Sequence, residues 1–264
     1  MIDLRPRYQL DLAGQNCVQR ALARLREFEP PDGYALAFSG GKDSVCIKRL
    51  ADMAGVKYAA CYNVTTIDPP PVIRFMRREH PDVAFCKPLK YRGFVAAVRD
   101  NGLPNRRRRW CCKWFKEHDA EPGKVKVMGM RMAERRPSGR GQRAVELCAR
   151  TGQRVVNPIF DWTDADVWGF IRSERVPYCK LYDQGWKRIG CICCPFASPA
   201  QKSRNLARWP FVFGQIRKAF THWWTVRERP PELIGPMFAW WLGDMRGKSP
   251  ASQWIREHKH GETP

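Results

Sequence analysis

The stretch that decides the fold is Tyr34 to Ser44, which reads Y-A-L-A-F-S-G-G-K-D-S. It opens with a short apolar run between Pro30-Pro31-Asp32-Gly33 and a pair of glycines, a pattern typical of a buried strand. From Asp43 onward the apolar residues fall at helical spacing, and Gly55 marks the end of that helix. The sequence therefore predicts a strand, a glycine turn and a helix.

This unit has the composition of a phosphate-binding loop. Gly40 and Gly41 let backbone N–H groups approach a ligand, and the positive end of the following helix points to the same place. Lys42 adds a positive charge, and Asp43 or Ser44 can cap the helix or hold a metal ion. The spacing is not the G-x-x-x-x-G-K-[ST] of a Walker A loop. The structural alternative is a strand-to-helix turn with Asp43 as its N-cap.

Composition narrows the class of protein. The 264 residues include 47 Lys and Arg against 26 Asp and Glu, so the formal net charge is +21. This charge favours polyanionic partners such as DNA or RNA, and a solvated basic surface is the alternative. No apolar leader and no membrane-length apolar run are visible, so we expect a cytoplasmic protein without a membrane partner. The eleven Cys then favour metal-binding thiolates over a disulfide scaffold.

Strands and helices alternate beyond the phosphate loop. We expect further strands at 57–64, 83–86, 124–130 and 154–159, and helices at 8–29, 72–79 and 91–99. Such alternation predicts an α/β fold with a doubly wound, mostly parallel sheet, whose ligands bind beyond the carboxyl ends of the strands. The phosphate loop, the turn at 65–68 and the turn at 129–134 would then meet in one crevice.

The composition shifts from Pro199, where aromatic residues fall at helical spacing and little strand signal remains. We interpret this region as a helical C-terminal layer whose Trp residues belong to a core; the alternative is that they stack on nucleic-acid bases. Three regions are therefore expected: a nucleotide-binding domain with the metal motif at 1–195, a Trp-rich helical region at 196–245, and a polar tail at 246–264.

Two pairs of cysteines suggest a metal centre. Cys111 and Cys112 follow a run of four arginines and Trp110, and Cys191 and Cys194 form a C-x-x-C around Cys193. Four thiolates suit zinc or an iron–sulfur cluster. Adjacent cysteines are unusual for structural zinc, and the arginines would offset the negative charge of a cluster, so we favour [4Fe–4S].

The other cysteines divide into two groups. Cys193 is a spare thiol or a sulfur carrier, and Cys179 has no assigned role. The rest lie within apolar patterns and are expected to act as small hydrophobic residues: Cys17, Cys46, Cys61, Cys86 and Cys148.

Several motifs together resemble the phosphoadenosine phosphosulfate (PAPS) reductase family of PP-loop proteins, which has a Rossmann-like fold. They are S-G-G-K-D-S at 39–44, T-T-I-D-P-P at 65–70, R-W-C-C at 109–112, G-M-R-M-A-E at 129–134, P-I-F-D-W-T-D-A-D-V-W at 158–168 and Y-D-Q-G-W-K-R-I-G-C-I-C-C-P at 182–195. Adenylylsulfate (APS) reductases of this family bind a [4Fe–4S] cluster through adjacent cysteines plus a C-x-x-C. The resemblance thus implies Cys111, Cys112, Cys191 and Cys194 as metal ligands.

Two departures separate this chain from the reductases of that family. Those enzymes carry a catalytic cysteine in a C-terminal segment, whereas here no cysteine follows Cys194. Their phosphate loop tends to be degenerate, whereas this one is intact, as in relatives that split ATP between the α and β phosphates. Both departures favour ATP pyrophosphatases that adenylate a target for sulfur insertion, such as the Dnd- and Ssp-type enzymes of DNA phosphorothioation and the tRNA thiolases.

The resemblance implies a site for ATP and Mg²⁺. We expect the nucleotide to contact Ser39, Gly40, Gly41, Lys42, Asp43, Ser44, Asp68 and Glu134, and we expect Lys42, Asp43 and Arg131 to be catalytic. For Arg131 and Glu134 a surface ion pair is the alternative. The motif around Thr163 and Asp166 is interpreted as a helix start with a capping-box-like arrangement, with Trp162 lining the site.

The expected partners are nucleic acid, either DNA or tRNA, and a cysteine desulfurase or other sulfur donor. Arg106 to Arg109 and Arg135 to Arg143 are the expected polyanion contacts, and the cluster or a partner's persulfide would deliver the sulfur. Whether the chain forms a homo-oligomer is open. Two alternatives remain: a PAPS or APS reductase that uses an external thiol, and a non-enzymatic, cluster-bearing subunit that senses nucleotides and binds nucleic acid.

Overall fold

A computed structural model of the chain describes residues 16–88, 90–116, 123–134, 143–148, 152–243 and 249–253. The chain divides into two compact units, each assembled from segments that are far apart in sequence. The first unit draws on residues 1–63, 70–86 and 119–189, and the second on 64–69, 87–118 and 190–264. Part of the expected N-terminal helix, at 8–15, and most of the expected tail lie outside the described residues.

The first unit contains a six-stranded sheet with the order β3-β2-β1-β4-β6-β5. Its strands are β1 (Tyr34–Ala37), β2 (Tyr58–Asn63), β3 (Ala84–Cys86), β4 (Lys126–Val127), β5 (Val145–Leu147) and β6 (Arg154–Val156). All neighbouring strands are parallel except β5, an antiparallel edge strand that the sequence pattern did not predict. The mostly parallel α/β fold is confirmed. The strand order reverses between β1 and β4, which makes that point the switch point where such sheets bind ligands.

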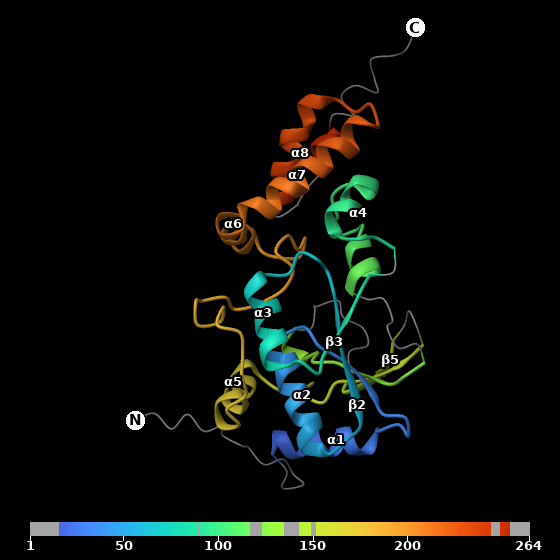
Figure 1. Cartoon of the computed structure of the whole chain (residues 1–264), viewed down its shortest axis with the longest axis vertical. Coiled ribbons are helices and arrows are strands. Elements are labelled where there is room, and N and C mark those ends of the chain that lie inside the picture. Colours follow the sequence, from blue (N-terminus) through green and yellow to red (C-terminus); the bar gives the residue numbers. More distant parts are fainter. Residues whose placement is uncertain are drawn as a thin grey trace. The chain divides into compact units, whose positions relative to one another are not determined.

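Three helices of this unit pack together beside the phosphate loop. Helix α2 (Lys42–Ala54) contacts both α1 (Cys17–Glu27) and α5 (Asp164–Ser173) (Figure 1). Its apolar side chains are buried at helical spacing, and Gly55, at φ +70°, ends it in the left-handed conformation that favours glycine. The predicted strand, turn and helix are therefore confirmed.

Helix α3 (Pro70–Glu79) also belongs to the first unit. Its buried residues Val72, Phe75 and Met76 lie on one face, as the spacing predicts. In the sheet, Leu36 of β1 and Val127 of β4 are almost fully buried, and each such side chain contributes roughly 1.5–3 kcal/mol of hydrophobic stabilisation. The sheet core therefore holds the strand ends of β1 and β4 in place.

The second unit is helical. It contains α4 (Phe94–Asn101), a short π-helical turn at Cys112–Lys116, α6 (Pro199–Arg208), α7 (Pro210–Thr225), a 3-10 turn at Pro231–Leu233 and α8 (Ile234–Leu242). Helix α4 packs on α7, and α6, α7 and α8 pack on one another around buried aromatic rings (Figure 1). The helical C-terminal layer is thus confirmed. No helix within the described ranges is both long and apolar enough to cross a bilayer.

Candidate active site

The phosphate loop follows β1 and ends at the N-terminus of α2. Gly40 has φ +68°, and a Cβ atom there would lie 2.9 Å from Val72 Cγ1 and 2.9 Å from Met76 Cγ of α3. Two constraints therefore require glycine at position 40: the positive φ angle and the close approach of the loop backbone to α3. Inside the loop, Ser44 Oγ donates to the Gly41 carbonyl at 2.9 Å and accepts from the Ser39 amide at 3.2 Å. These bonds hold the turn in one shape.

The first turn of α2 is open to a ligand. Its N-cap is Gly41, and no side chain of the loop caps it. The Lys42 amide instead donates to the hydroxyl of Tyr182 at 2.8 Å. Because a helix N-terminus attracts anions, the Tyr182 hydroxyl lies where a phosphate oxygen could accept the same N–H. Asp43 does not cap the helix, so that alternative is wrong.

Four charged side chains form a network beside the loop. Lys42 Nζ lies 2.9 Å from Asp43 Oδ2 and 3.3 Å from Asp164 Oδ1. Arg131 Nε donates to Asp43 Oδ1 at 2.8 Å, and its Nη2 donates to Asp164 Oδ1 at 2.6 Å. Each cation therefore contacts both carboxylates. The two cations come from the segments that follow β1 and β4, the two strands at the switch point.

The network is buried on its cationic side and open on its acidic side. Lys42 is 5% exposed and Arg131 is 3% exposed, whereas the side chain of Asp164 is 68% exposed. Burial by itself raises the pKa of Asp164. The charge of Lys42 and the hydrogen bond from Arg131 lower this pKa by more than burial raises it, so the net pKa is lowered and the carboxyl stays ionised. An ionised Asp164 thus compensates part of the charge of two buried cations.

Gly129 lets the end of β4 approach the loop. A Cβ atom at this position would lie 3.1 Å from Asp43 Cβ, so a larger residue would push the strand end away from α2. Arg131, two residues later, is held further by a hydrogen bond of its Nη1 to the Trp162 carbonyl at 3.4 Å. The G-M-R motif thereby places its arginine on the phosphate loop.

The structure brings most of the residues expected at the ATP site together and places two further side chains beside them. It brings Ser39 to Ser44 and Arg131 together, as expected, and Arg131 is buried, which excludes the alternative of a surface ion pair. Asp164 and Tyr182 were missed. Asp164 stands in the D-W-T-D motif, whose only apparent role in the sequence was the helix start, and no local pattern links Tyr182 to the loop. Glu134 ends the 3-10 helix Met132–Glu134, and its side chain lies outside the described part.

The helix start at 163–166 is confirmed. Thr163 caps α5 and accepts from the Asp166 amide, while the Asp166 carboxylate accepts from the Thr163 amide, which completes a capping box. Trp162 is 1% exposed and donates its indole N–H to the Cys17 carbonyl at 3.2 Å. It is therefore a core residue and does not line the site.

Asp68 lies in the second unit. Its carboxylate accepts a hydrogen bond from Thr65 Oγ1 at 2.6 Å. The negative charge of Asp68 also raises the pKa of Lys116, after the larger effect of Cys191. The contact of Asp68 with a nucleotide stays a prediction.

The four cysteines of the expected metal motif lie in one region of the second unit. A hydrogen bond with Cys112 and then burial raise the pKa of Cys111, with further contributions from the charges of Cys191 and Cys194. Burial raises the pKa of Cys191 to about 12. The four thiols are thus close enough for their charges to interact. However, no group of three or more His, Cys, Asp or Glu within the described ranges is arranged to hold a metal ion.

The remaining cysteines differ from the sequence expectation at one pair. Cys61 of β2 and Cys86 of β3 form a disulfide, because the parallel pairing of these strands brings their Cα atoms to 6.3 Å. Their interpretation as free hydrophobic residues is wrong. Cys46, Cys179 and Cys193 are buried free thiols.

The two expected basic contact regions are described in part. Arg106, Arg107 and Arg108 are exposed in the loop before the cysteine pair, and the Arg109 guanidinium lies 4.9 Å from the Phe196 ring centroid. Of the second region, 135–142 lies outside the described residues and Arg143 is exposed.

The sheet order, the glycine turn and the buried cations at the switch point define an α/β nucleotide-binding protein of the PP-loop kind. The family described as "phosphoadenosine phosphosulfate reductase domain" matches residues 33–197, more than half of the chain. The chain belongs to this family.

Curated relatives support the assignment. An uncharacterized protein of Methanocaldococcus jannaschii is 28% identical over 224 residues, which cover 76% of this chain and 54% of that protein. The adenosine 5'-phosphosulfate reductase of Allochromatium vinosum is 41% identical over 66 residues, or 25% of this chain and 26% of the reductase. A probable FAD synthase of Schizosaccharomyces pombe is 27% identical over 184 residues, or 66% of this chain and 64% of the synthase. The chain thus spans about half of the first of these relatives.

Proposed function

We propose that this protein binds ATP on the phosphate loop and adenylates a nucleic-acid substrate for sulfur insertion. The observation that carries the proposal is the network in which Lys42 and Arg131, 5% and 3% exposed, meet beside the open N-terminus of α2. Two buried cations are costly unless charged partners compensate them. Asp43 and Asp164 supply that compensation without a ligand, and a polyphosphate supplies more.

The position of these cations suits cleavage between the α and β phosphates. Negative charge develops on the departing pyrophosphate, and fixed positive charges in a buried site stabilise it more than water does. Backbone amides of the loop and of the first turn of α2 add donors for the same oxygens, the Lys42 amide among them if a phosphate oxygen takes the place of the Tyr182 hydroxyl. One relative, 27% identical over 184 residues, is named as a probable FAD synthase.

Asp43 and Asp164 are the residues that would hold Mg²⁺. In nucleotide sites this ion is usually bound by one or two carboxylates together with phosphate oxygens, and the network contains two carboxylates with one of them exposed. When bound, the ion neutralises charge on the phosphates.

The proposed reaction has two stages, adenylation of the substrate and transfer of sulfur. In the first, an oxygen of the substrate attacks the α-phosphorus of ATP and forms a new P–O bond; the bond to the oxygen that bridges to the β-phosphorus breaks, pyrophosphate leaves, and a proton, where the attacking oxygen carries one, goes to water. The terminal sulfur of a persulfide on a partner protein then displaces AMP. A second thiol cleaves the resulting S–S bond, becomes oxidised to a disulfide and leaves one sulfur on the substrate.

Cys111, Cys112, Cys191 and Cys194 would hold a [4Fe–4S] cluster. Such clusters take four thiolates, which is the number of cysteines in the motif, and the charges of Cys191 and Cys194 contribute to the raised pKa of Cys111. A cluster there supplies one-electron chemistry and links two segments of the chain. Neither step above needs its electrons.

Pyrophosphate release from ATP tests the proposal. Lys42→Ala should lower release at least about 100-fold, because it removes a charge that stabilises the leaving group. Lys48→Ala is the matched control: Lys48 lies on the same helix but pairs with Asp82 at 3.0 Å, so its activity should stay near that of the unaltered protein. The assay runs with single-stranded DNA, duplex DNA and tRNA in parallel.

Two results would contradict the proposal. Equal activity of Lys42→Ala and the unaltered protein would remove the ATP-site assignment. Binding of ATP without any pyrophosphate release, with or without nucleic acid, would leave a nucleotide-sensing subunit that is not an enzyme.

The local identity of 41% with an adenosine 5'-phosphosulfate reductase favours a second candidate, sulfonucleotide reduction with an external thiol. That activity would release sulfite and AMP from adenylylsulfate as a dithiol is oxidised to a disulfide. Sulfite formation without pyrophosphate release from ATP would replace the first candidate by this one.

A further inference from the structure

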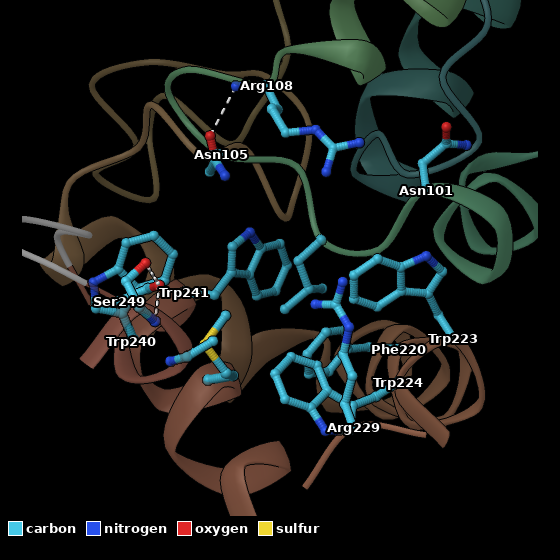
Figure 2. Close-up of a pocket in the computed structure, with 14 residues that line it drawn as sticks. Asn101, Asn105, Arg108, Phe220, Trp223, Trp224, Arg229, Trp240, Trp241 and Ser249 are labelled. Atoms are coloured by element: carbon cyan, nitrogen blue, oxygen red, sulfur yellow. Dashed lines mark hydrogen bonds between the residues drawn. The ribbon is translucent and has the colours of Figure 1, made fainter. Parts of the chain in front are cut away.

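A pocket in the second unit has no role in the reaction proposed above. Its volume is about 270 Å³, just below the range of roughly 300–1,000 Å³ that is typical of small-ligand sites. Helices α7 and α8 contribute Trp223, Trp224, Trp240 and Trp241 to its walls, and the loop after α4 contributes Asn105 and Arg108 (Figure 2). A pocket of this size fits one aromatic ring system with a small polar group.

The tryptophan walls are fixed in place by hydrogen bonds. The indole N–H of Trp223 donates to the Asp100 carbonyl at 3.1 Å, that of Trp224 to the Pro230 carbonyl at 2.8 Å, and that of Trp241 to the Pro104 carbonyl at 2.7 Å. Trp240 differs, because its Nε1 is buried and has no hydrogen-bond partner. A buried N–H without a partner is costly, and this one is closed off from the pocket. Trp223, Trp224 and Trp241 are 8%, 1% and 2% exposed, so the half-buried Trp240 is the ring that can present a face to a ligand.

Arginines give the pocket a positive charge. The Arg229 guanidinium lies 4.5 Å from the Trp223 ring centroid and 5.1 Å from that of Trp224, beside both rings (Figure 2). Burial, followed by the charges of Arg227 and Arg108, lowers the pKa of Arg229. Within the described part of the chain, no acidic side chain forms an ion pair with Arg108 or Arg229. An anion bound in the pocket would supply a counter-charge to Arg108 and Arg229.

Flat aromatic walls and unpaired arginines together recognise one class of ligand. Base stacking on an aromatic side chain contributes roughly 1–3 kcal/mol per base, and guanidinium groups bind phosphate with two parallel hydrogen bonds. We infer that this pocket binds one nucleotide of a single-stranded nucleic acid, with its base on Trp240 and its phosphate on Arg108 and Arg229. Exposed Arg106 and Arg107 precede Arg108, and they would extend the positive surface along a bound nucleic-acid strand. The Trp residues thus belong to the hydrophobic core, as expected, and they also line the proposed binding pocket.

This inference stands on the pocket and does not require ATP cleavage. The Lys42→Ala variant should bind the strand as tightly as the unaltered protein, whether or not the proposed adenylation occurs. Failure of one proposal is therefore visible separately from failure of the other.

Fluorescence anisotropy of a labelled single-stranded oligonucleotide with the full chain tests the inference. Arg229→Gln should weaken binding about tenfold, the loss expected for a charged hydrogen bond. Arg217→Gln is the matched control, because Arg217 is an exposed arginine of α7 that lies 6.0 Å from the Phe238 ring and does not line the pocket. Trp240→Ala, which removes the ring that can stack on a base, should weaken binding about tenfold.

Two outcomes support the pocket and distinguish the source of its ligand. Competition by AMP against a bound strand, with both affinities lowered in Arg229→Gln, shows a nucleotide within nucleic acid. Tight, Arg229-dependent binding of AMP without strand binding shows a free nucleotide of the same chemistry. Equal losses in Arg229→Gln and Arg217→Gln would overturn the inference, because general charge would then explain binding. Strand binding that is unchanged in both Arg229→Gln and Trp240→Ala would overturn it as well.

Discussion

Replacing Gly40 by alanine is the sharpest perturbation of the phosphate loop, because two separate costs meet at one residue. The first cost is conformational, since the φ of +68° lies in the left-handed region. The second is steric, since the new Cβ would lie 2.9 Å from Val72 Cγ1 and 2.9 Å from Met76 Cγ. Carbon atoms normally pack at about 3.5–4.0 Å. Val72 and Met76 are 1% and 0% exposed, so neither side chain can move into solvent.

Gly55 provides a matched control for the conformational cost. Its φ is +70°, almost equal to that of Gly40, but a Cβ there would meet nothing within 4 Å. A left-handed alanine costs about 1–2 kcal/mol, of which about 0.4–1 kcal/mol is recovered through the unfolded chain. Gly55→Ala should therefore lower the free energy of unfolding by about 0.5–1.5 kcal/mol. Gly40→Ala should cost an additional 1–3 kcal/mol, approximately, from overpacking.

Urea denaturation of the full chain, followed by far-UV circular dichroism, measures both variants. The expected difference between Gly40→Ala and Gly55→Ala is about 1–3 kcal/mol. In a Val72→Ala background the additional cost of Gly40→Ala should shrink, because neighbouring sites couple. Equal destabilisation by the two glycine substitutions would refute the packing of the loop on α3. Gly40→Ala should also release less pyrophosphate, since the loop amides move with the backbone.

Two further predictions concern the metal motif and a helix terminus. In protein purified anaerobically, Cys112→Ser should lose iron and the brown colour of a cluster, whereas Cys193→Ser should keep both. Unchanged iron in Cys112→Ser would exclude the expected ligand set. A colourless protein that contains zinc would exclude the cluster. Thr163→Ala should lower the free energy of unfolding by about 1 kcal/mol through loss of the α5 cap, with Thr163→Ser as the conservative control; an unchanged denaturation midpoint would show that the capping box is not stabilising.

Local sequence determined the elements that depend on residues close together in the chain. The apolar run, the glycine pair and the helical spacing up to Gly55 correctly predicted β1, the loop and α2, because each signal acts within one strand or a few turns. The capping box of α5 was visible for the same reason, since its two partners are three residues apart. The parallel sheet followed from alternation of these elements.

The sequence pattern missed the short edge strand β5, because this strand is defined by its pairing with β6. It has three residues, Val145–Leu147, and its antiparallel pairing with β6 defines it as a strand. The disulfide between Cys61 and Cys86 likewise depends on the pairing of β2 with β3, which a sequence pattern does not show.

The tertiary structure alone decided which side chains complete the sites. Tyr182 reaches the Lys42 amide across 140 residues of sequence, and Asp164 reaches Arg131 across 33. Trp241 is fixed to Pro104 across 137 residues, and this contact joins α8 to the loop that carries Arg108. Sequence determined the loop because backbone conformation and helix formation are local, whereas the charged network and the tryptophan pocket exist only where folding brings distant segments within hydrogen-bonding distance.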